Sequence, residues 1–259
     1  MTDTVIIIPA RYGSTRLPGK PLIDIAGKTM VERVWRLAKQ VSGVSAVLVA
    51  TDDDRIAEEV ASFGGEAVIT PEACKNGTER ALAAVQACGL SPDVVINLQG
   101  DAPLTPPWVI QAMVDEMASG STADICTPAT RLTGEKLAYF LREKEITPQT
   151  GTSVVMDKDQ NALYFSKSIL PFSRNEREEV FRHVGLYAYR LDVLKALCAL
   201  PESPLERAEK LEQLRALENG YAIKVTIVDY RGRSHASVDA LEDVARVEAI
   251  LASEGEPTL

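Results

Sequence analysis

The sequence predicts an α/β fold in which a mostly parallel sheet is covered by helices on both faces. The first observation is that short apolar runs alternate with segments of helical spacing over residues 5–120, as they do in consecutive β-α units. The second is that the opening run, residues 5–8, is Val-Ile-Ile-Ile, which is typical of a strand buried on both faces. The third is the length of 259 residues, which suits one large domain with a full core. We therefore expect right-handed crossovers around a central sheet.

The first half of the chain supplies these strands and helices in alternation. Capping and breaking residues bound them: Asp52, Asp53 and Asp54 form an N-cap cluster before one helix, and Gly64 and Gly65 end it. The expected strands are residues 5–8, 46–50, 66–70 and 94–98, and the expected helices are residues 30–41, 55–63, 76–88 and 106–119.

The second half changes character and predicts a smaller, partly antiparallel layer. Residues 153–156 and 162–166 flank a polar turn and predict a hairpin. Residues 131–152 are polar and indicate no element. The remaining expected elements are strands at residues 183–189 and 225–228 and helices at residues 206–219 and 240–251.

Composition narrows the class of protein. The chain carries 28 Lys and Arg against 37 Asp and Glu, a formal charge of −9, which argues against a nucleic-acid or anionic membrane partner. Four scattered cysteines imply neither a zinc site nor a disulfide framework. No long apolar run or leader is evident, so we expect a cytoplasmic protein without membrane insertion.

The loop after the first strand predicts an anion site. Arg11, Arg16 and Lys20 lie in a segment too rich in glycine and proline to be a helix, and such a loop can fold its cations and N–H groups around a nucleoside triphosphate. The spacing differs from a Walker phosphate loop, because Gly13 and Gly19 are one residue too far apart, and no G-x-G-x-x-G motif is present here. The alternative is an exposed loop with solvated cations.

Two carboxylates are candidate Mg²⁺ ligands beside that loop. Asp101 directly follows the strand at residues 94–98, and Asp239 precedes the last helix. Mg²⁺ prefers one or two carboxylates together with phosphate oxygens and waters. The alternatives are a turn aspartate for Asp101 and an N-cap for Asp239.

Two further segments have both functional and structural interpretations. Gly77 to Arg80 places N–H groups and a cation at a helix start, which can hold a base or a phosphate or be an ordinary capped helix. His183 is either a ligand contact or a satisfied, half-buried imidazole. No covalent nucleophile with a partner base is indicated, so the expected chemistry is direct displacement at phosphorus, driven by alignment and charge neutralisation.

Several blocks taken in order resemble the 3-deoxy-manno-octulosonate cytidylyltransferases, the CMP-Kdo synthetases. The resemblance covers most of the chain and is carried by IPARYGSTRLPGKPL at residues 8–22, ATDD at 50–53, NLQGD at 97–101, ALYFS at 162–166, RHVGLY at 182–187 and LEQLR at 211–215.

The resemblance implies a Rossmann-like nucleotide-diphospho-sugar transferase fold in a single domain, residues 1–259. Residues 1–130 would be its nucleotide-binding half, and residues 131–259 its sugar-binding and dimerisation half. It implies CTP and Mg²⁺ as cosubstrate and cofactor, attack by the anomeric hydroxyl of an eight-carbon ulosonic acid, a homodimer, and a role in surface polysaccharide or lipopolysaccharide biosynthesis.

The resemblance also implies roles for individual residues. Arg16 and Lys20 would hold the triphosphate and, with Asp101, act in catalysis. The nucleotide site would further include Ala10, Arg11, Gly77, Arg80 and Gln99. Asp101 and Asp239 would bind the metal. The sugar acid would contact Lys167, Arg174, His183, Tyr187, Glu212 and Gln213.

The chain departs from the family mainly on the acceptor side. Lys167 stands where the family usually has Arg, and Ala102 stands where it has Glu; the first change removes a forked donor for a carboxylate. Residues 149–155 replace the family's Asn-Pro-Asn segment. The acceptor could therefore be Kdo, a modified Kdo or a different ulosonic acid. Two alternatives are a nucleotidyltransferase for sugar phosphates and a non-catalytic nucleotide-binding homologue.

Overall fold

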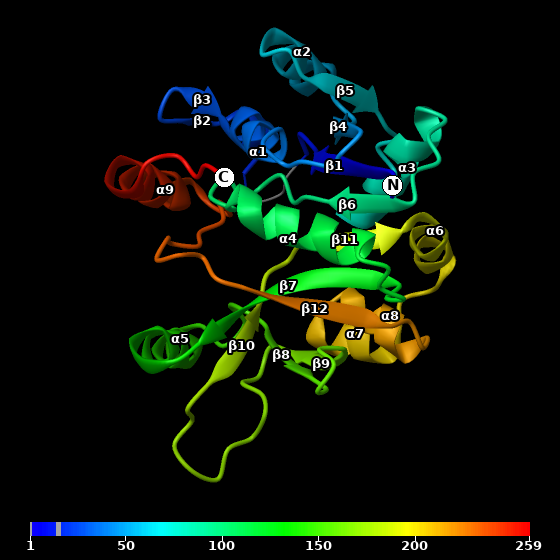
Figure 1. Ribbon diagram of the computed structural model, residues 1–259. Coiled ribbons are helices and arrows are strands. Elements are labelled where there is room, and N and C mark those ends of the chain that lie inside the picture. Colours follow the sequence, from blue (N-terminus) through cyan, green and yellow to red (C-terminus); the bar gives the residue numbers. More distant parts are fainter. Residues whose placement is uncertain (1, 14–16) are drawn as a thin grey trace.

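A computed structural model describes residues 2–13 and 17–259 and confirms the α/β prediction. Across these residues ten strands form one sheet in the order β5-β4-β1-β6-β11-β7-β10-β8-β9, with β12 paired to β7. Helices lie on both sides of it (Figure 1). A second sheet holds only β2 and β3. Among the described helices, none is long and apolar enough to cross a membrane.

The first half forms the parallel part of the sheet as predicted. Strands β4, β1 and β6 run parallel side by side, and β5 continues the sheet beyond β4. The bounds are β1 Thr4–Ala10, β2 Asp24–Ile25, β3 Lys28–Thr29, β4 Ala46–Thr51, β5 Glu66–Ile69 and β6 Val94–Asn97, with η1 Lys20–Leu22, α1 Met30–Ala38, α2 Asp54–Ser62, α3 Gly77–Ala87 and α4 Pro107–Ala118.

The two-residue period of β1 explains how its faces are covered. Val5 and Ile7 belong to the hydrophobic cluster that contains residues of α3, whereas Ile6 and Ile8 belong to the cluster that contains residues of α1 and α4. Successive strand side chains point to opposite faces, so an unbroken apolar run is what a strand covered on both faces requires.

The second half extends the same sheet with antiparallel strands. Strand β11 runs antiparallel between β6 and β7, β10 and the β8-β9 hairpin follow, and β12 lies parallel to β7. The bounds are β7 Ile125–Leu132, β8 Ser153–Met156, β9 Ala162–Ser166, β10 Val180–His183, β11 Tyr187–Arg190 and β12 Ile223–Val228, with α5 Gly134–Ile146, α6 Leu191–Ala199, α7 Pro204–Glu209, α8 Gln213–Glu218 and α9 Leu241–Glu254.

Two predicted elements, one strand and one helix, are each divided into two in the structure. The strand expected at residues 183–189 is two strands, β10 and β11, because residues 184–186 leave the sheet between them. This interruption lets β7 pair with β11 at one end and with β10 at the other. The helix expected at residues 206–219 is also two, α7 and α8, separated at Lys210, whose φ of 55° is left-handed.

The longer elements β7, α5 and α6 lie where the sequence patterns indicated none, and so do the short elements η1, β2 and β3. Helix α5 occupies most of the polar segment 131–152, and it buries only Leu137, Phe140 and Lys144. Such a narrow apolar stripe gives little periodic signal.

Candidate functional site

The loop that follows β6 approaches the carboxyl end of β1 closely. A Cβ on Gly100 would lie 2.6 Å from the backbone oxygen of Pro9, so a larger residue there would push the two loops apart. A Cβ on Gly77, at the start of α3, would lie 3.5 Å from Nε2 of Gln99. The predicted nucleotide residues Gly77 and Gln99 therefore lie together, beside Pro9 and the end of β1 at Ala10.

Lys20 is held at this edge by the loop that precedes it. Gly19 has a φ of 71°, and its N–H donates to the backbone oxygen of Tyr12 at 2.9 Å. Lys20 then begins η1, and its ammonium lies 3.0 Å from Oδ2 of Asp101 and 3.5 Å from Oδ1 of Asp239. The structure thus brings together one predicted triphosphate ligand and both predicted metal ligands.

Asp239 reaches this position because its neighbour pairs with Asp101. The N–H of Val238 donates to the backbone oxygen of Asp101 at 3.0 Å. The start of α9 is capped by Asp243, whose Oδ2 accepts from the N–H groups of Asp239 and Ala240 at 2.8 and 2.9 Å. The interpretation of Asp239 as the N-cap is therefore wrong, because its carboxylate faces Lys20 while Asp243 does the capping.

Asp101 and Asp239 fit the donor set that Mg²⁺ requires. Their side chains are 38% and 42% exposed, whereas Lys20 is only 12% exposed. Two partly exposed carboxylates converge on one cation, and Mg²⁺ is usually bound by one or two carboxylates, with phosphate oxygens and waters completing the shell. No group of three or more acidic, histidine or cysteine ligands occurs within residues 2–13 and 17–259.

Arg80 lies in the interior rather than at the surface of the nucleotide edge. It is 2% exposed, and its guanidinium donates to Oδ2 of Asp52 and to the hydroxyl of Thr70, each at 2.7 Å. Asp52 belongs to the predicted capping cluster, but the cap of α2 is Asp53. The pairing of Asp52 with Arg80 was missed because the two residues are 28 positions apart.

The remaining loop cations have different positions. Arg11 is exposed at the end of β1. Its neighbour Tyr12 stacks under the guanidinium of Arg55, 3.4 Å from the ring centroid, which fixes the start of the loop. Arg16, predicted to bind the triphosphate, lies outside the described residues.

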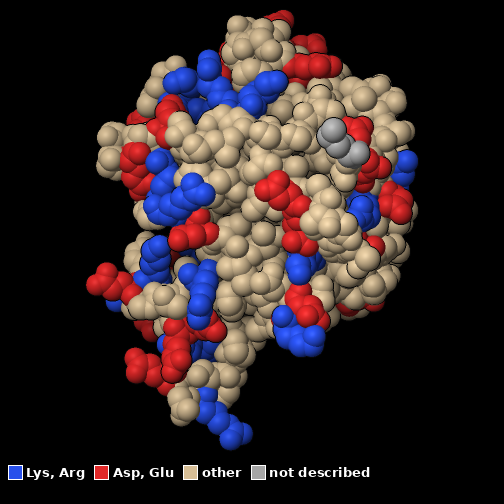
Figure 2. All heavy atoms as spheres, in the orientation of Figure 1, with Lys and Arg blue, Asp and Glu red and all other residues tan. Residues whose placement is uncertain are grey.

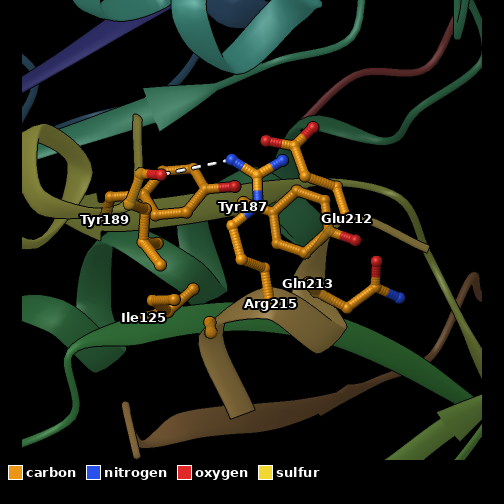
Figure 3. A pocket seen from close by; sticks show the side chains of 8 residues that line it. Ile125, Tyr187, Tyr189, Glu212, Gln213 and Arg215 are labelled. Carbon is orange, nitrogen blue, oxygen red and sulfur yellow. Dashed lines mark hydrogen bonds between the residues drawn. The ribbon is translucent and has the colours of Figure 1, made fainter. Parts of the chain in front are cut away.

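A second group of predicted residues meets in a pocket between β11 and α8. Tyr187, Glu212 and Gln213 line it, as do Tyr189 and Arg215 (Figure 3). The guanidinium of Arg215 donates to the backbone oxygen of Leu197 at 3.2 Å, drawn as the dashed line. The free volume is about 10 Å³, the space of roughly one water molecule, so an eight-carbon acid would have to bind at the rim or displace the lining side chains.

Burial is the main cause of the pKa shifts of the side chains that line this pocket. Loss of hydration raises the pKa of Glu212, although hydrogen bonding to Thr78 and the charge of Arg215 oppose the shift. Burial also raises the pKa of Tyr187, with the charge of Glu212 adding to it. The amide nitrogen of Gln213 is buried without a hydrogen-bond partner in the described structure. A donor in that state favours binding of a ligand that carries an acceptor.

His183 lies next to this pocket and is tightly surrounded. Its ring meets Phe165 edge-on, with centroids 5.0 Å apart, and lies 5.5 Å from the ring of Tyr187. Desolvation, and to a smaller extent the charge of Lys167, lower the pKa of His183 to about 3. Burial also lowers the pKa of the Lys167 ammonium. The backbone N–H of Lys167 donates to the carboxylate of Glu209 at 2.8 Å.

Arg174 is not brought to the pocket. It is exposed in the long connection between β9 and β10, which projects away from the body of the molecule at the bottom of Figure 1. The structure therefore assembles Tyr187, Glu212 and Gln213, places His183 beside them, and leaves Arg174 apart.

The predicted nucleotide edge and the pocket that holds the predicted sugar-acid residues adjoin through the sheet. Tyr187 is paired with Asn97 across β11 and β6, and Gln99 and Asp101 follow Asn97 at the end of β6. The hydroxyl of Thr78, one residue after Gly77, accepts from the Asn97 amide at 3.4 Å and hydrogen-bonds Glu212. Neither Asn97 nor Thr78 was singled out from sequence, because their contacts join distant segments.

Comparison with known proteins identifies the family of the chain. The cytidylyltransferase family model matches residues 5–227. The 3-deoxy-manno-octulosonate cytidylyltransferase of Maricaulis maris (strain MCS10) is 54% identical over 256 residues, which cover 98% of this chain and 99% of that protein. The enzyme of that name from Escherichia coli is 40% identical, covering 98% of each.

A solved structure gives the same result. CMP:2-keto-3-deoxy-manno-octonic acid synthetase complexed with CTP superposes with a TM-score of 0.87 at 39% identity, covering 98% of this chain and 100% of that one. The fold and site thus define a nucleotidyltransferase of the cytidylyltransferase class. Within that class, the chain belongs to the 3-deoxy-manno-octulosonate cytidylyltransferase family.

Proposed function

We propose that this enzyme transfers CMP from CTP to the anomeric hydroxyl of a 3-deoxy-octulosonic acid, Kdo or a modified Kdo, and releases pyrophosphate. The observation that carries the proposal is the convergence of Asp101 and Asp239 on Lys20, at 3.0 and 3.5 Å. At one sheet edge, a cation can bind a triphosphate and two carboxylates can bind its metal ion. The relatives named above act in this reaction class.

On the nucleotide side, Lys20 and Arg16 hold the triphosphate, while Gly77 and Gln99 line the nucleoside site together with Ala10 and Arg11. Arg80 contributes from beneath, with its orientation set by Asp52 and Thr70. These residues align the α-phosphorus and the leaving pyrophosphate, which is most of the catalysis that a direct displacement needs.

Asp101 and Asp239 would hold Mg²⁺, and no ligand other than phosphate oxygen and water is then needed. When bound, the ion supplies neutralisation of the charge that develops on the phosphoryl oxygens. Before it binds, the ammonium of Lys20 keeps the two carboxylates close to each other.

On the acceptor side, His183, Tyr187, Glu212 and Gln213 bind the sugar acid, and Lys167 and Arg174 provide positive charge for its carboxylate. Arg174 can reach the acceptor only if the loop that carries it moves. Because Lys167 is a point charge rather than a guanidinium fork, a related 2-keto sugar acid is the second candidate acceptor.

The proposal extends to the setting of the enzyme. A homodimer formed in part by residues 131–259, a cytoplasmic location, and a role in surface polysaccharide or lipopolysaccharide biosynthesis fit a cytidylyltransferase of this family.

The test is a matrix of four nucleoside triphosphates against Kdo and several other 2-keto sugar acids, with pyrophosphate release as the readout and Mg²⁺ present or removed by chelation. We expect turnover only with CTP, only with an ulosonic acid, and only with the metal. Turnover of a sugar phosphate with UTP or GTP would contradict the proposal, and so would CTP binding without turnover of any acid.

A further inference from the structure

The hydroxyl of Thr127, on β7, has an unusual set of neighbours. Its Oγ1 lies 2.7 Å from the backbone oxygen of Leu186 and 2.8 Å from Nε2 of His183. A third atom, the backbone oxygen of Val184, is 3.4 Å away. Thr127 itself has no exposed surface, so water does not compete for these contacts.

These distances determine where the protons lie. A threonine hydroxyl has a single proton to donate. The oxygen of Leu186 can only accept, and two oxygens 2.7 Å apart repel each other unless a proton lies between them. The hydroxyl proton therefore lies on the line to Leu186. The remaining contact then requires Nε2 of His183 to carry a proton and donate it to Thr127.

Protonation of Nε2 leaves the other ring nitrogen as an acceptor. A neutral imidazole has one donor and one acceptor nitrogen, and the low pKa of His183 keeps the ring neutral at physiological pH. Contacts with Phe165 and Tyr187 hold the ring in place. Within the described residues, Nδ1 takes part in no hydrogen bond of its own, so its lone pair is available to a ligand.

We propose that Thr127 is a positioning residue that holds His183 in the Nε2–H tautomer, so that Nδ1 accepts a hydrogen bond from a hydroxyl of the acceptor sugar. The inference rests on the proposed function for the identity of that acceptor. It assigns His183 to a hydroxyl of the sugar, and leaves the carboxylate to the cationic side chains.

The first test is spectroscopic and uses the ligand-free protein. Long-range ¹H–¹⁵N spectra distinguish the two neutral tautomers and the imidazolium, and the chain has only two histidines, so His235→Gln assigns both. We expect His183 to show the Nε2–H pattern at pH 7. A Nδ1–H or imidazolium pattern in the unmodified protein would overturn the proposal, whatever the enzyme turns over.

The second test uses variants of Thr127. Thr127→Val keeps the shape but removes the hydroxyl, and should give a mixture of tautomers and a KM for the sugar acid raised roughly three- to tenfold, the size of one lost neutral hydrogen bond. The KM for CTP should not change. Thr127→Ser should restore both the spectrum and the KM.

Thr130→Val is the matched control, because Thr130 lies on the same strand and its hydroxyl donates to the backbone of Arg182 rather than to His183. It should leave both readouts unchanged. An unaltered His183 spectrum in a folded Thr127→Val protein would refute the role of Thr127, and this outcome is independent of whether Kdo is the acceptor.

Discussion

At the scale of single residues, the main feature is that the ammonium of Lys20 contacts the carboxylates of both Asp101 and Asp239. Two carboxylates that approach the same point repel each other unless a cation lies between them. The ammonium of Lys20 is that cation in the structure, with contacts of 3.0 and 3.5 Å. In the proposed reaction Asp101 and Asp239 would hold Mg²⁺, and Lys20 would then be available to the triphosphate.

The proposed metal-binding role of Asp101 predicts the effect of Asp101→Asn. The variant should keep CTP binding within a fewfold, because Lys20 and the rest of the nucleotide edge remain. Its kcat should fall by a factor on the order of 100 to 1,000, since metal stabilisation of the transition state contributes several kcal/mol. The measurement is steady-state pyrophosphate release over a range of CTP and Mg²⁺ concentrations.

Asp115→Asn is the control for that variant, because Asp115 is exposed on α4 and, among residues 2–13 and 17–259, its side chain is hydrogen-bonded only to Gln111. It should leave kcat unchanged. Near-normal turnover of Asp101→Asn at saturating Mg²⁺ would remove Asp101 from the metal site.

Individual residues were predictable where local sequence marks a strand end. Lys20 lies in the loop after one strand and Asp101 follows another, so the edge at which they meet could be inferred before the contacts were known. Asp239 was only a candidate for a second carboxylate, because its position before a helix does not place it at that edge. Thr127 and its partner His183 are 56 positions apart. No local pattern encodes such a pairing, because it depends on how β7 and β10 are placed in the sheet.

At the scale of elements, patterns with strong turn chemistry were predicted well. The hairpin of β8 and β9 has the bounds expected from sequence, because Asp157 fixes its turn by accepting from the N–H groups of Asp159 and Asn161, both at 2.8 Å. Helices α7 and α8 were joined in error, since the residues on both sides of Lys210 favour a helix and the interruption comes from tertiary contacts. Glu209, the last residue of α7, accepts from Ser166 at 2.6 Å.

The ion pair between α7 and α8 leads to a prediction about stability. Arg215 donates to Glu206 at 2.6 and 2.9 Å, and the two side chains are only 11% and 10% exposed. Burial alone would raise the pKa of Glu206, but the bonds from Arg215 and from the N–H of Ser203 lower it overall. Glu206→Gln should therefore reduce the free energy of unfolding by about 2–4 kcal/mol, since it leaves a buried cation unpaired.

A neighbouring pair supplies the comparison. Glu202 and Arg207 are 3.1 Å apart, but their side chains are 46% and 62% exposed. Glu202→Gln should cost no more than about 0.5 kcal/mol. Both variants can be measured by urea unfolding at pH 7. Equal losses would show that the α7-α8 pair contributes no more than a surface ion pair.

At the scale of the whole molecule, one sheet carries both parts of the site. The nucleotide edge lies at β1 and β6, the acceptor pocket begins at β11, and β11 is hydrogen-bonded to β6. In the proposed function, the position of the acceptor relative to the nucleotide would therefore be set by strand pairing. On the face shown in Figure 2, acidic and basic side chains are interspersed, so local charge pairs rather than a broad charged surface characterise that side.

The place of His183 in this sheet predicts how stability depends on pH. The ring contacts β7, β9 and β11 from its own strand β10, and its pKa is about 3 in the folded chain, against about 6.5 when unfolded. Below pH 6.5 His183 binds a proton in the unfolded chain but remains neutral in the folded chain. The free energy of unfolding should therefore fall as the pH is lowered, by up to about 1.4 kcal/mol per pH unit from this group, and less in proportion to the water that reaches the ring.

Comparison of variants isolates this contribution. Glu212 acts in the opposite direction, because its raised pKa means that the folded chain takes up a proton first. The difference between the unmodified protein and His183→Gln cancels that effect, since Glu212 is present in both. Between pH 6.5 and 5, unfolding in urea should show a shallower loss of stability for His183→Gln. His235→Gln should also give a shallower loss than the unmodified protein, because desolvation, with the charges of Arg182 and Arg246, lowers the pKa of His235 to about 4. Parallel pH profiles for the unmodified protein and His183→Gln would mean that His183 remains accessible to protons in the folded state, which would also weaken the case for its fixed neutral tautomer.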